Sequence, residues 1–247
     1  MDREPRDHLD AVCFDLDGVL IDSEHAWDAA RRAVVGESGG LWRPEATRAM
    51  MGMSAAEWSQ YLHDELGVPL SPPEINERVV ERLLAGYRRE LPLLPGAVAA
   101  VKRLAARWPL GLASSSNRPV IDYILEASGL AGSFAVTVSA DEVARGKPAP
   151  DVYLAAAAKL SVAPTRAAAV EDSSNGLRSA AGAGMLVVAI PNREFPPEAD
   201  ALALADVILE SLAELVPEAL DARAAARPEL RWPLSAPLPV PGPTKTT

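Results

Sequence analysis

The stretch Ala11–Glu24, AVCFDLDGVLIDSE, places two carboxylates, Asp15 and Asp17, at the end of an apolar run. A short and almost continuous apolar run such as residues 11–14 is typical of a buried strand in a parallel sheet. On an extended chain Asp15 and Asp17 lie on the same side of the backbone, and Gly18 lets the chain turn directly after them. Unless a cation, a proton or donor groups compensate these two adjacent like charges, one carboxylate should shift toward its neutral form, which is the form that a general acid needs. A turn rich in Asp that caps the next helix is the alternative.

The composition narrows the class of protein. A chain of 247 residues with 49% hydrophobic and 23% charged residues is typical of a globular protein with one large domain, or a core and a small satellite. The formal net charge of −10, without a basic stripe, argues against nucleic acid or an anionic membrane surface as the partner. A phosphate pocket stays possible, because one or two placed cations suffice for it.

Cysteine content and hydropathy indicate the compartment. The single cysteine, Cys13, excludes an intrachain disulfide and fits a reducing environment. The N-terminal residues 1–10 contain no apolar signal region, and no apolar run approaches membrane-spanning length. We therefore expect a cytoplasmic protein.

Helix signals dominate the seventy or so residues after the first strand. Residues 23–35 have the pattern of a helix, and two later helices begin with the Ser–Glu spacing of a capping box, at Ser54 with Glu57 and at Ser71 with Glu74. These signals predict an all-helical block.

From residue 93 onward, strands and helices alternate, which predicts right-handed βαβ units on a parallel sheet. The expected strands are residues 109–116, 134–140, 167–173 and 185–190, and the segments 205–209 and 211–220 close the series. The expected helices are residues 95–108, 118–130, 149–160 and 175–184.

Together these patterns predict an α/β fold in which a helical cap is inserted after the first strand of a Rossmann-like parallel-sheet core. We expect the core to comprise residues 9–21 and 93–213, and the cap to comprise residues 22–92. Residues 226–247 are rich in proline and lack a helical or strand period, so we expect a disordered tail. A polyproline ligand for a partner domain is the alternative.

Polar side chains cluster at the predicted strand ends, where open parallel sheets bind their ligands. They are Asp15, Asp17, Ser114, Ser115, Ser116, Glu171 and Asp172, with Lys147 in a loop that could reach the same edge. Taken singly, the serines could cap the helices that follow, as could Asn117, and Lys147 could be a solvated loop residue. Their joint occurrence on elements that should converge favours a site.

Four segments in this order resemble the motifs of the haloacid dehalogenase superfamily. They are DLDGV from Asp15, the serine end of GLASSS, GKPAPDVY around Lys147, and VEDSSNG. The spacing, with a helical insertion after the first motif, is similar to the β-phosphoglucomutase-like phosphatase branch. The resemblance covers roughly residues 11–190, and four ordered motifs are far more specific than a lone DxD.

The resemblance implies a role for each of these side chains. Asp15 would be the nucleophile that forms an aspartyl-phosphate, and Asp17 would protonate the leaving alcohol and then deprotonate water. Ser114 and Ser115 would bind the phosphate, and Lys147 would neutralise charge on Asp15 and on the transferring group.

The resemblance also implies Mg²⁺ as the cofactor, since this hard cation prefers oxygen ligands. The ligands would be the Asp15 carboxylate, the backbone carbonyl of Asp17 and the Asp172 carboxylate. Glu171 would assist directly or through water.

The resulting prediction is a phosphatase for a small phosphorylated metabolite, with its oligomeric state left open; Asp17 argues against the dehalogenases, which lack the second aspartate. The alternatives are a sugar-phosphate mutase and a catalytically silent metabolite-binding protein. The mutase uses a histidine and an arginine of its cap, where this chain has Trp27 and Ala55, so hydrolysis is favoured. Within the cap, Glu24, His25 and Trp27 are candidates to face the substrate, and helix packing is the alternative for them.

Overall fold

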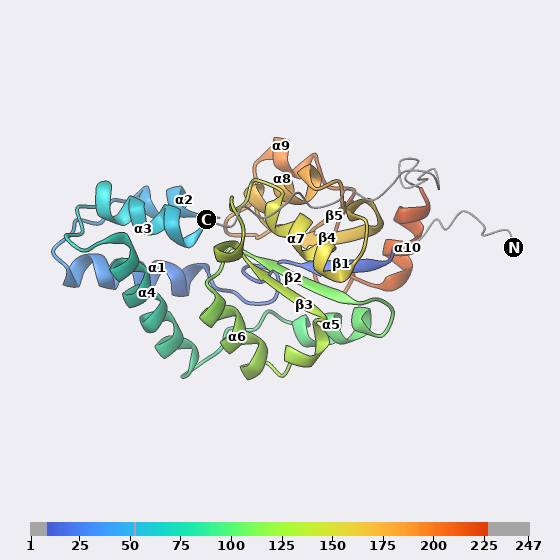
Figure 1. Cartoon of the computed structure of the whole chain (residues 1–247), viewed down its shortest axis with the longest axis horizontal. Coiled ribbons are helices and arrows are strands. Elements are labelled where there is room, and N and C mark those ends of the chain that lie inside the picture. The colour runs from blue at the N-terminus through green and yellow to red at the C-terminus, as the bar shows by residue number, and fades with distance from the viewer. Residues whose placement is uncertain (1–8, 52, 227–247) are drawn as a thin grey trace, which may run out of the picture.

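A parallel sheet with helices on both faces forms one end of the molecule, and a group of helices forms the other (Figure 1). This computed structural model describes residues 9–51 and 53–226. The strands are β1 Ala11–Phe14, β2 Leu110–Ser114, β3 Val136–Ser139, β4 Ala167–Glu171, β5 Leu186–Ala189 and β6 Val207–Ile208. They pair in the order β3-β2-β1-β4-β5-β6, and every pair is parallel. The predicted α/β fold is confirmed.

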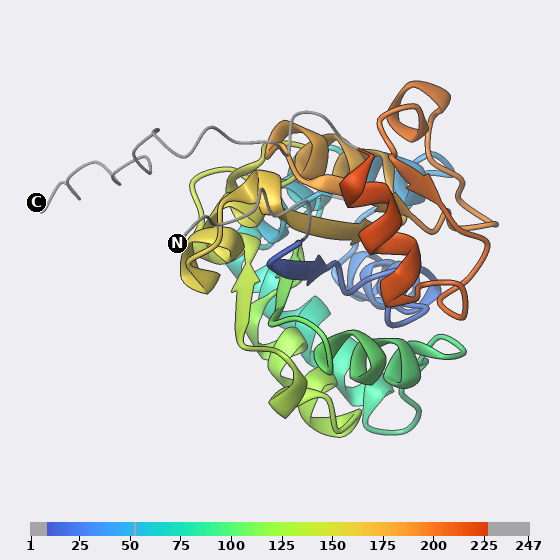
Figure 2. The same cartoon turned by 90° about the vertical axis from the view of Figure 1, so that its right-hand side faces the viewer.

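Strand residues alternate between two apolar layers. Val12 and Phe14 belong to the cluster that contacts α5, α6 and α10, whereas Ala11 and Cys13 belong to the cluster that contacts α7, α8 and α9. These helices are α5 Ala97–Ala105, α6 Arg118–Ala127, α7 Asp151–Leu160, α8 Ser174–Gly182, α9 Ala199–Leu202 and α10 Pro217–Ala225. Figure 2 shows α7 and α10 on opposite sides of the sheet. Short 3₁₀ turns are η1 Ala131–Ser133, η2 Ala140–Glu142 and η3 Pro164–Arg166.

Four helices form the insertion between β1 and α5: α1 Glu24–Glu37, α2 Ala46–Met50, α3 Ala55–Asp64 and α4 Pro72–Tyr87. Both predicted capping boxes form, since the Ser54 N–H donates to the Glu57 carboxylate at 2.7 Å and the Ser71 N–H donates to Glu74 at 2.9 Å. Helix α2 was not predicted as a separate element, because five residues are too few to show a helical period.

The chain enters and leaves this insertion along two neighbouring segments. The Asp22 N–H donates to the Pro92 carbonyl at 2.8 Å, and the Leu94 N–H donates to the Leu20 carbonyl at 3.0 Å. These hydrogen bonds hold the two ends of the insertion side by side.

Helix α10 extends the sheet domain past residue 213, where the core was expected to end. Leu220 and Ala224 are buried in the same cluster as α5. Arg103 of α5 fixes the segment before α10 by donating to the carbonyl oxygens of Leu212 and Leu215, both at 2.8 Å. The tail predicted for residues 226–247 lies outside the described residues, apart from its first residue. Within the described ranges, every helix is too short or too polar to cross a membrane.

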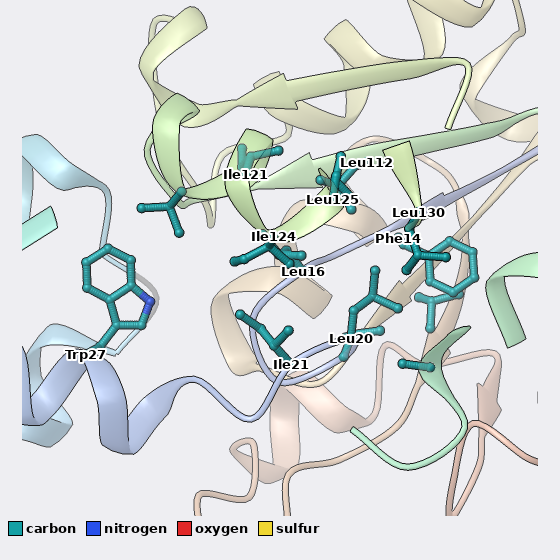
Figure 3. Close-up of a cluster of buried hydrophobic side chains, with 14 of the residues drawn as sticks. Phe14, Leu16, Leu20, Ile21, Trp27, Leu112, Ile121, Ile124, Leu125 and Leu130 are labelled. Atoms are coloured by element: carbon teal, nitrogen blue, oxygen red, sulfur yellow. The ribbon is translucent and has the colours of Figure 1, made fainter. Parts of the chain in front are cut away.

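The core predicts a clear asymmetry between two isoleucines. Ile124 of α6 is 1% exposed and lies in the cluster of Figure 3, so Ile124→Ala should lower the free energy of unfolding by about 2–5 kcal/mol. Ile208→Ala is the matched control, because Ile208 is 54% exposed, and it should cost less than about 0.5 kcal/mol. Urea denaturation followed by circular dichroism measures both; equal losses would contradict this description of the core.

Candidate active site

The predicted site residues meet where the order of strands reverses. Strand β1 lies between β2 and β4, so the chain leaves β1 toward one side of the sheet and returns to its other side. The Asp15 N–H donates to the Val170 carbonyl at 3.0 Å, which holds the end of β1 beside the end of β4. Ligands of open parallel sheets bind at such a point, beyond the carboxyl ends of the strands.

A buried ammonium links two buried carboxylates at this edge. The Lys147 Nζ donates to Asp15 Oδ1 at 2.7 Å and to Glu171 Oε1 at 2.6 Å. Burial lowers the pKa of Lys147, but the carboxylates of Asp15 and Glu171 raise this pKa by a larger amount, so the side chain stays charged. The Tyr153 hydroxyl also donates to Glu171 Oε1, at 2.7 Å, and its ring centroid lies 5.0 Å from Nζ. Tyr153 and Glu171 thus orient the lysine toward Asp15.

The donor set fits Mg²⁺. Carboxylate oxygens of Asp15, Glu171 and Asp172 lie within 4.8 Å of one another. Burial raises the pKa of Asp15 to about 8, against the lowering effect of Lys147, and burial with neighbouring carboxylates raises the pKa of Asp172 well above its usual range. Three carboxylates around one ammonium leave two negative charges, which a divalent cation with oxygen ligands would compensate.

Asp172 has a carboxylate oxygen that is less engaged in hydrogen bonds than the oxygens of Glu171. Its Oδ1 is buried without a hydrogen-bond partner among the described residues. Glu171, by contrast, accepts bonds from Lys147 and Tyr153 on Oε1 and from the Asp172 N–H on Oε2, at 3.2 Å. Asp15 and Asp172 are therefore better placed than Glu171 to give oxygens to a metal ion.

Asp17 is held from both the sheet domain and the helical insertion. The indole N–H of Trp27, on α1, donates to Asp17 Oδ1 at 3.0 Å. On the other oxygen, Ser116 Oγ donates at 2.6 Å and Ser114 Oγ lies at 3.5 Å. A serine hydroxyl can donate to an ionised carboxylate and accept from a protonated one, so Ser116 suits both states of an acid–base group.

A narrow cavity of about 60 Å³ lies between the strand ends and the inserted helices. The predicted site residues that line it are Asp15, Asp17, Glu24, Trp27, Ser115, Lys147 and Asp172. Ser114 and Glu171 are fully buried beneath it. His25 lies elsewhere, because its side chain is 66% exposed and pairs with Glu194 at 2.9 Å.

Comparison with known proteins agrees with this geometry. A family model with the description "Hydrolase: haloacid dehalogenase-like hydrolase" matches residues 9–184. The chain belongs to this family. It is 37% identical over 219 residues to hexitol phosphatase B of Escherichia coli, covering 85% of this chain and 96% of the relative.

Two solved structures extend the comparison. A mutant of CbbY from Rhodobacter sphaeroides in complex with xylulose-1,5-bisphosphate is 29% identical, with a TM-score of 0.74 over 83% of this chain and 96% of the other. A β-phosphoglucomutase from Clostridium difficile has a TM-score of 0.76 over 88% and 98% of the two chains, and at 21% identity it supports the fold alone.

In each of two haloacid dehalogenase motifs, one position leaves no space for a Cβ atom and therefore requires glycine, which the sequence did not reveal. Gly18 has a φ of +77°, and a Cβ there would lie 1.9 Å from Asp172 Oδ2. A Cβ on Gly176, in the first turn of α8, would lie 1.9 Å from Glu171 Oε2. Both glycines therefore make room for buried carboxylates. Ser173 caps α8, since its side chain accepts the Gly176 N–H at 3.1 Å.

Several cavity residues were missed or misjudged at the level of sequence. Ser116 is among the polar residues predicted at the strand ends but has no role in the predicted chemistry, although its two-residue spacing from Ser114 is a signal that both could face one side. Arg31 is 7% exposed and lines the cavity. The signal for Arg31 was its spacing, because residues 24, 27 and 31 share one face of a helix. Trp58 of α3, which also lines the cavity, had no comparable signal.

Gly18 gives a test of the metal-binding arrangement. Gly18→Ala should displace the Asp172 carboxylate and weaken Mg²⁺ binding at least about tenfold, because one of few oxygen ligands moves away. Gly129→Ala is the matched control, since Gly129 has a similar φ of +70° but nothing within 4 Å of its Cβ position. Isothermal titration calorimetry with Mg²⁺ measures both variants. Unchanged affinity in a folded Gly18→Ala variant would remove Asp172 from the ligand set.

Proposed function

We propose that the protein is a Mg²⁺-dependent phosphatase that hydrolyses a small phosphomonoester of a sugar or polyol through an aspartyl-phosphate on Asp15. The observation that carries this proposal is the buried bond between Lys147 and Asp15, in a cavity that Asp17 also lines. Hexitol phosphatase B, the relative at 37% identity, supports the class of substrate.

In the first half of the proposed reaction, an Asp15 carboxylate oxygen attacks phosphorus. The bond from phosphorus to the ester oxygen breaks, and Asp17 gives its proton to that oxygen, so that a neutral alcohol leaves. Lys147 lowers the pKa of Asp15 against the larger raising effect of burial, and it offsets charge on the phosphoryl oxygens. Ser115, whose buried Oγ has no partner among the described residues, is free to donate to one of those oxygens.

In the second half, Asp17 takes a proton from water, and the water oxygen attacks phosphorus. The bond from phosphorus to Asp15 breaks, inorganic phosphate leaves, and Asp17 ends protonated as it began. Trp27 and Ser116 hold the Asp17 carboxylate through both halves.

Mg²⁺ would be held by Asp15, Asp172 and the Asp17 backbone carbonyl, with Glu171 behind them. When bound, the ion supplies positive charge that lets an anionic phosphate approach an anionic nucleophile. Without it, the buried carboxylates favour their protonated forms.

Substrate admission requires the inserted helices to move. A cavity of about 60 Å³ has room for a few waters but not for a sugar phosphate, which needs a pocket of about 300 Å³ or more. Residues 22–92 act as the cap domain that moves, with the paired segments around Asp22 and Pro92 as its connection to the core.

Hydrolysis is favoured over phosphate transfer between two hydroxyls of one sugar, although the cap is not without charge. Trp27 occupies the position expected for the mutase histidine, and its indole gives a neutral hydrogen bond to Asp17 rather than a charged one to phosphate. Ala55 does not line the cavity, but Arg31 does. A mutase must hold a second phosphate, and Arg31 is the one cap cation available in the described lining.

The nucleophile is tested by Asp15→Asn. The change is nearly isosteric but the amide cannot form the acyl-phosphate, so phosphate release with Mg²⁺ should fall by at least about a thousandfold while the circular dichroism spectrum is kept. Asp64→Asn on exposed α3 is the control and should retain full activity. Substantial turnover by purified Asp15→Asn would contradict the assignment of Asp15 as the nucleophile.

The choice between hydrolase and mutase is tested with glucose 1-phosphate and related sugar monophosphates, with and without a bisphosphate primer. Release of inorganic phosphate should exceed formation of the isomeric sugar phosphate, because water competes for the aspartyl-phosphate with Asp17 as its base. Both products are measured in one reaction, by a phosphate assay and by ³¹P NMR. Isomerisation faster than phosphate release would contradict the proposed hydrolase function and support the mutase alternative.

A further inference from the structure

Arg31 is a buried charge without a contact partner of opposite sign. It is 7% exposed, its Nε has no hydrogen-bond partner, and it forms no ion pair with any carboxylate of the described residues. The guanidinium carbon lies 5.0 Å from the Trp27 ring centroid and 5.1 Å from the Trp58 ring centroid. Burial lowers the pKa of Arg31 to about 10, which still leaves it charged at neutral pH. A buried charge is costly unless a group completes its hydrogen bonds.

Arg31 lies where it could contact the leaving group of the substrate rather than the transferred phosphate. Trp27 reaches Asp17, the proposed proton donor, and Arg31 lies one turn further along α1, about 6 Å along the helix axis. Both residues line the same cavity, as does Glu24 at the start of α1. One helix face thus presents a carboxylate, an indole and a guanidinium, in order of increasing distance from the connection to the core.

The charges of the cavity oppose a second anion at this place. Its lining contains the carboxylates of Asp15, Asp17, Glu24 and Asp172 against the cations Arg31 and Lys147. Lys147 is already bonded to two carboxylates. A second phosphate would meet Arg31 alone and would be repelled by Glu24 and Asp17, whereas a hydroxyl group can accept from a guanidinium and donate to a carboxylate.

We infer that Arg31 is the specificity-determining residue of the cap and that it donates, with Glu24 as the paired acceptor, to hydroxyl groups of an uncharged polyhydroxylated leaving group. The inference rests on the proposed function and narrows its substrate class to monophosphates of polyols and sugars, as against bisphosphates.

Binding to the Asp15→Asn variant separates this inference from turnover. The probes are a hexitol 6-phosphate, phenyl phosphate and xylulose 1,5-bisphosphate, each titrated calorimetrically with Mg²⁺. Adding Arg31→Met should weaken binding of the hexitol phosphate about tenfold or more, as expected for losing a charged hydrogen bond, and should change phenyl phosphate binding less than about twofold. Arg31→Lys keeps the charge but not the planar fork, so it should restore only part of the loss.

Arg32→Met is the matched control, since Arg32 is the next residue on α1, is 49% exposed and pairs with Asp28. It should leave binding of all three probes unchanged. Equal losses for hexitol phosphate and phenyl phosphate would make Arg31 a packing residue, and a larger loss for the bisphosphate would make it a second phosphate site; either result overturns the inference. Thermal melts show that each variant is folded. If binding follows the expected pattern but the native chain releases no phosphate, the proposed function fails, and Arg31 is shown only to bind the hydroxyl groups of a phosphorylated polyol.

Discussion

The bond from Lys147 to Asp15 and Glu171 is the interaction on which the site depends. It joins residues 132 and 24 positions apart, and because all three side chains are buried their charges must be matched locally. One ammonium does not balance the carboxylates of Asp15, Glu171 and Asp172. The remaining negative charge explains the fit to a divalent cation, and it adds to the effect of burial, which is the main cause of the raised pKa values of Asp15 and Asp172. The same excess of negative charge that would destabilise the folded protein would favour the binding of a divalent cation.

Burial of these carboxylates also constrains the backbone around them. Gly18 and Gly176 lie against the carboxylates of Asp172 and Glu171, where no Cβ fits. In the motif DLDG, Gly18 therefore accommodates Asp172, a carboxylate of the other motif. In the motif EDSSNG, Gly176 accommodates Glu171, a carboxylate of its own motif. Parallel pairing of β1 with β4 brings the two motifs together, because it aligns Phe14 with Val170, the residues just before Asp15 and Glu171.

Sequence patterns predicted the elements and the chemistry better than the contacts between them. The strand periodicity, the capping boxes at Ser54 and Ser71 and the carboxylates at strand ends are local signals, and the structure contains them. The roles of Tyr153 and Arg31 depend on packing between distant segments, which no local period encodes. His25 illustrates the same limit, since a shift of two positions along α1 from Trp27 turns its side chain to solvent and to Glu194.

Asp17 connects the chemistry to the position of the cap. Its carboxylate is bonded on one oxygen by Ser116 of the core and on the other by Trp27 of α1. If the inserted helices move away to admit substrate, the Trp27 bond breaks while the Ser116 bond remains, so Asp17 gains freedom to rotate. Proton transfer requires a carboxyl group held within hydrogen-bond distance of the ester oxygen. In the proposed reaction, Asp17 is therefore fully oriented as proton donor only when the cap is closed, which would tie bond cleavage to the state in which the cavity excludes bulk water.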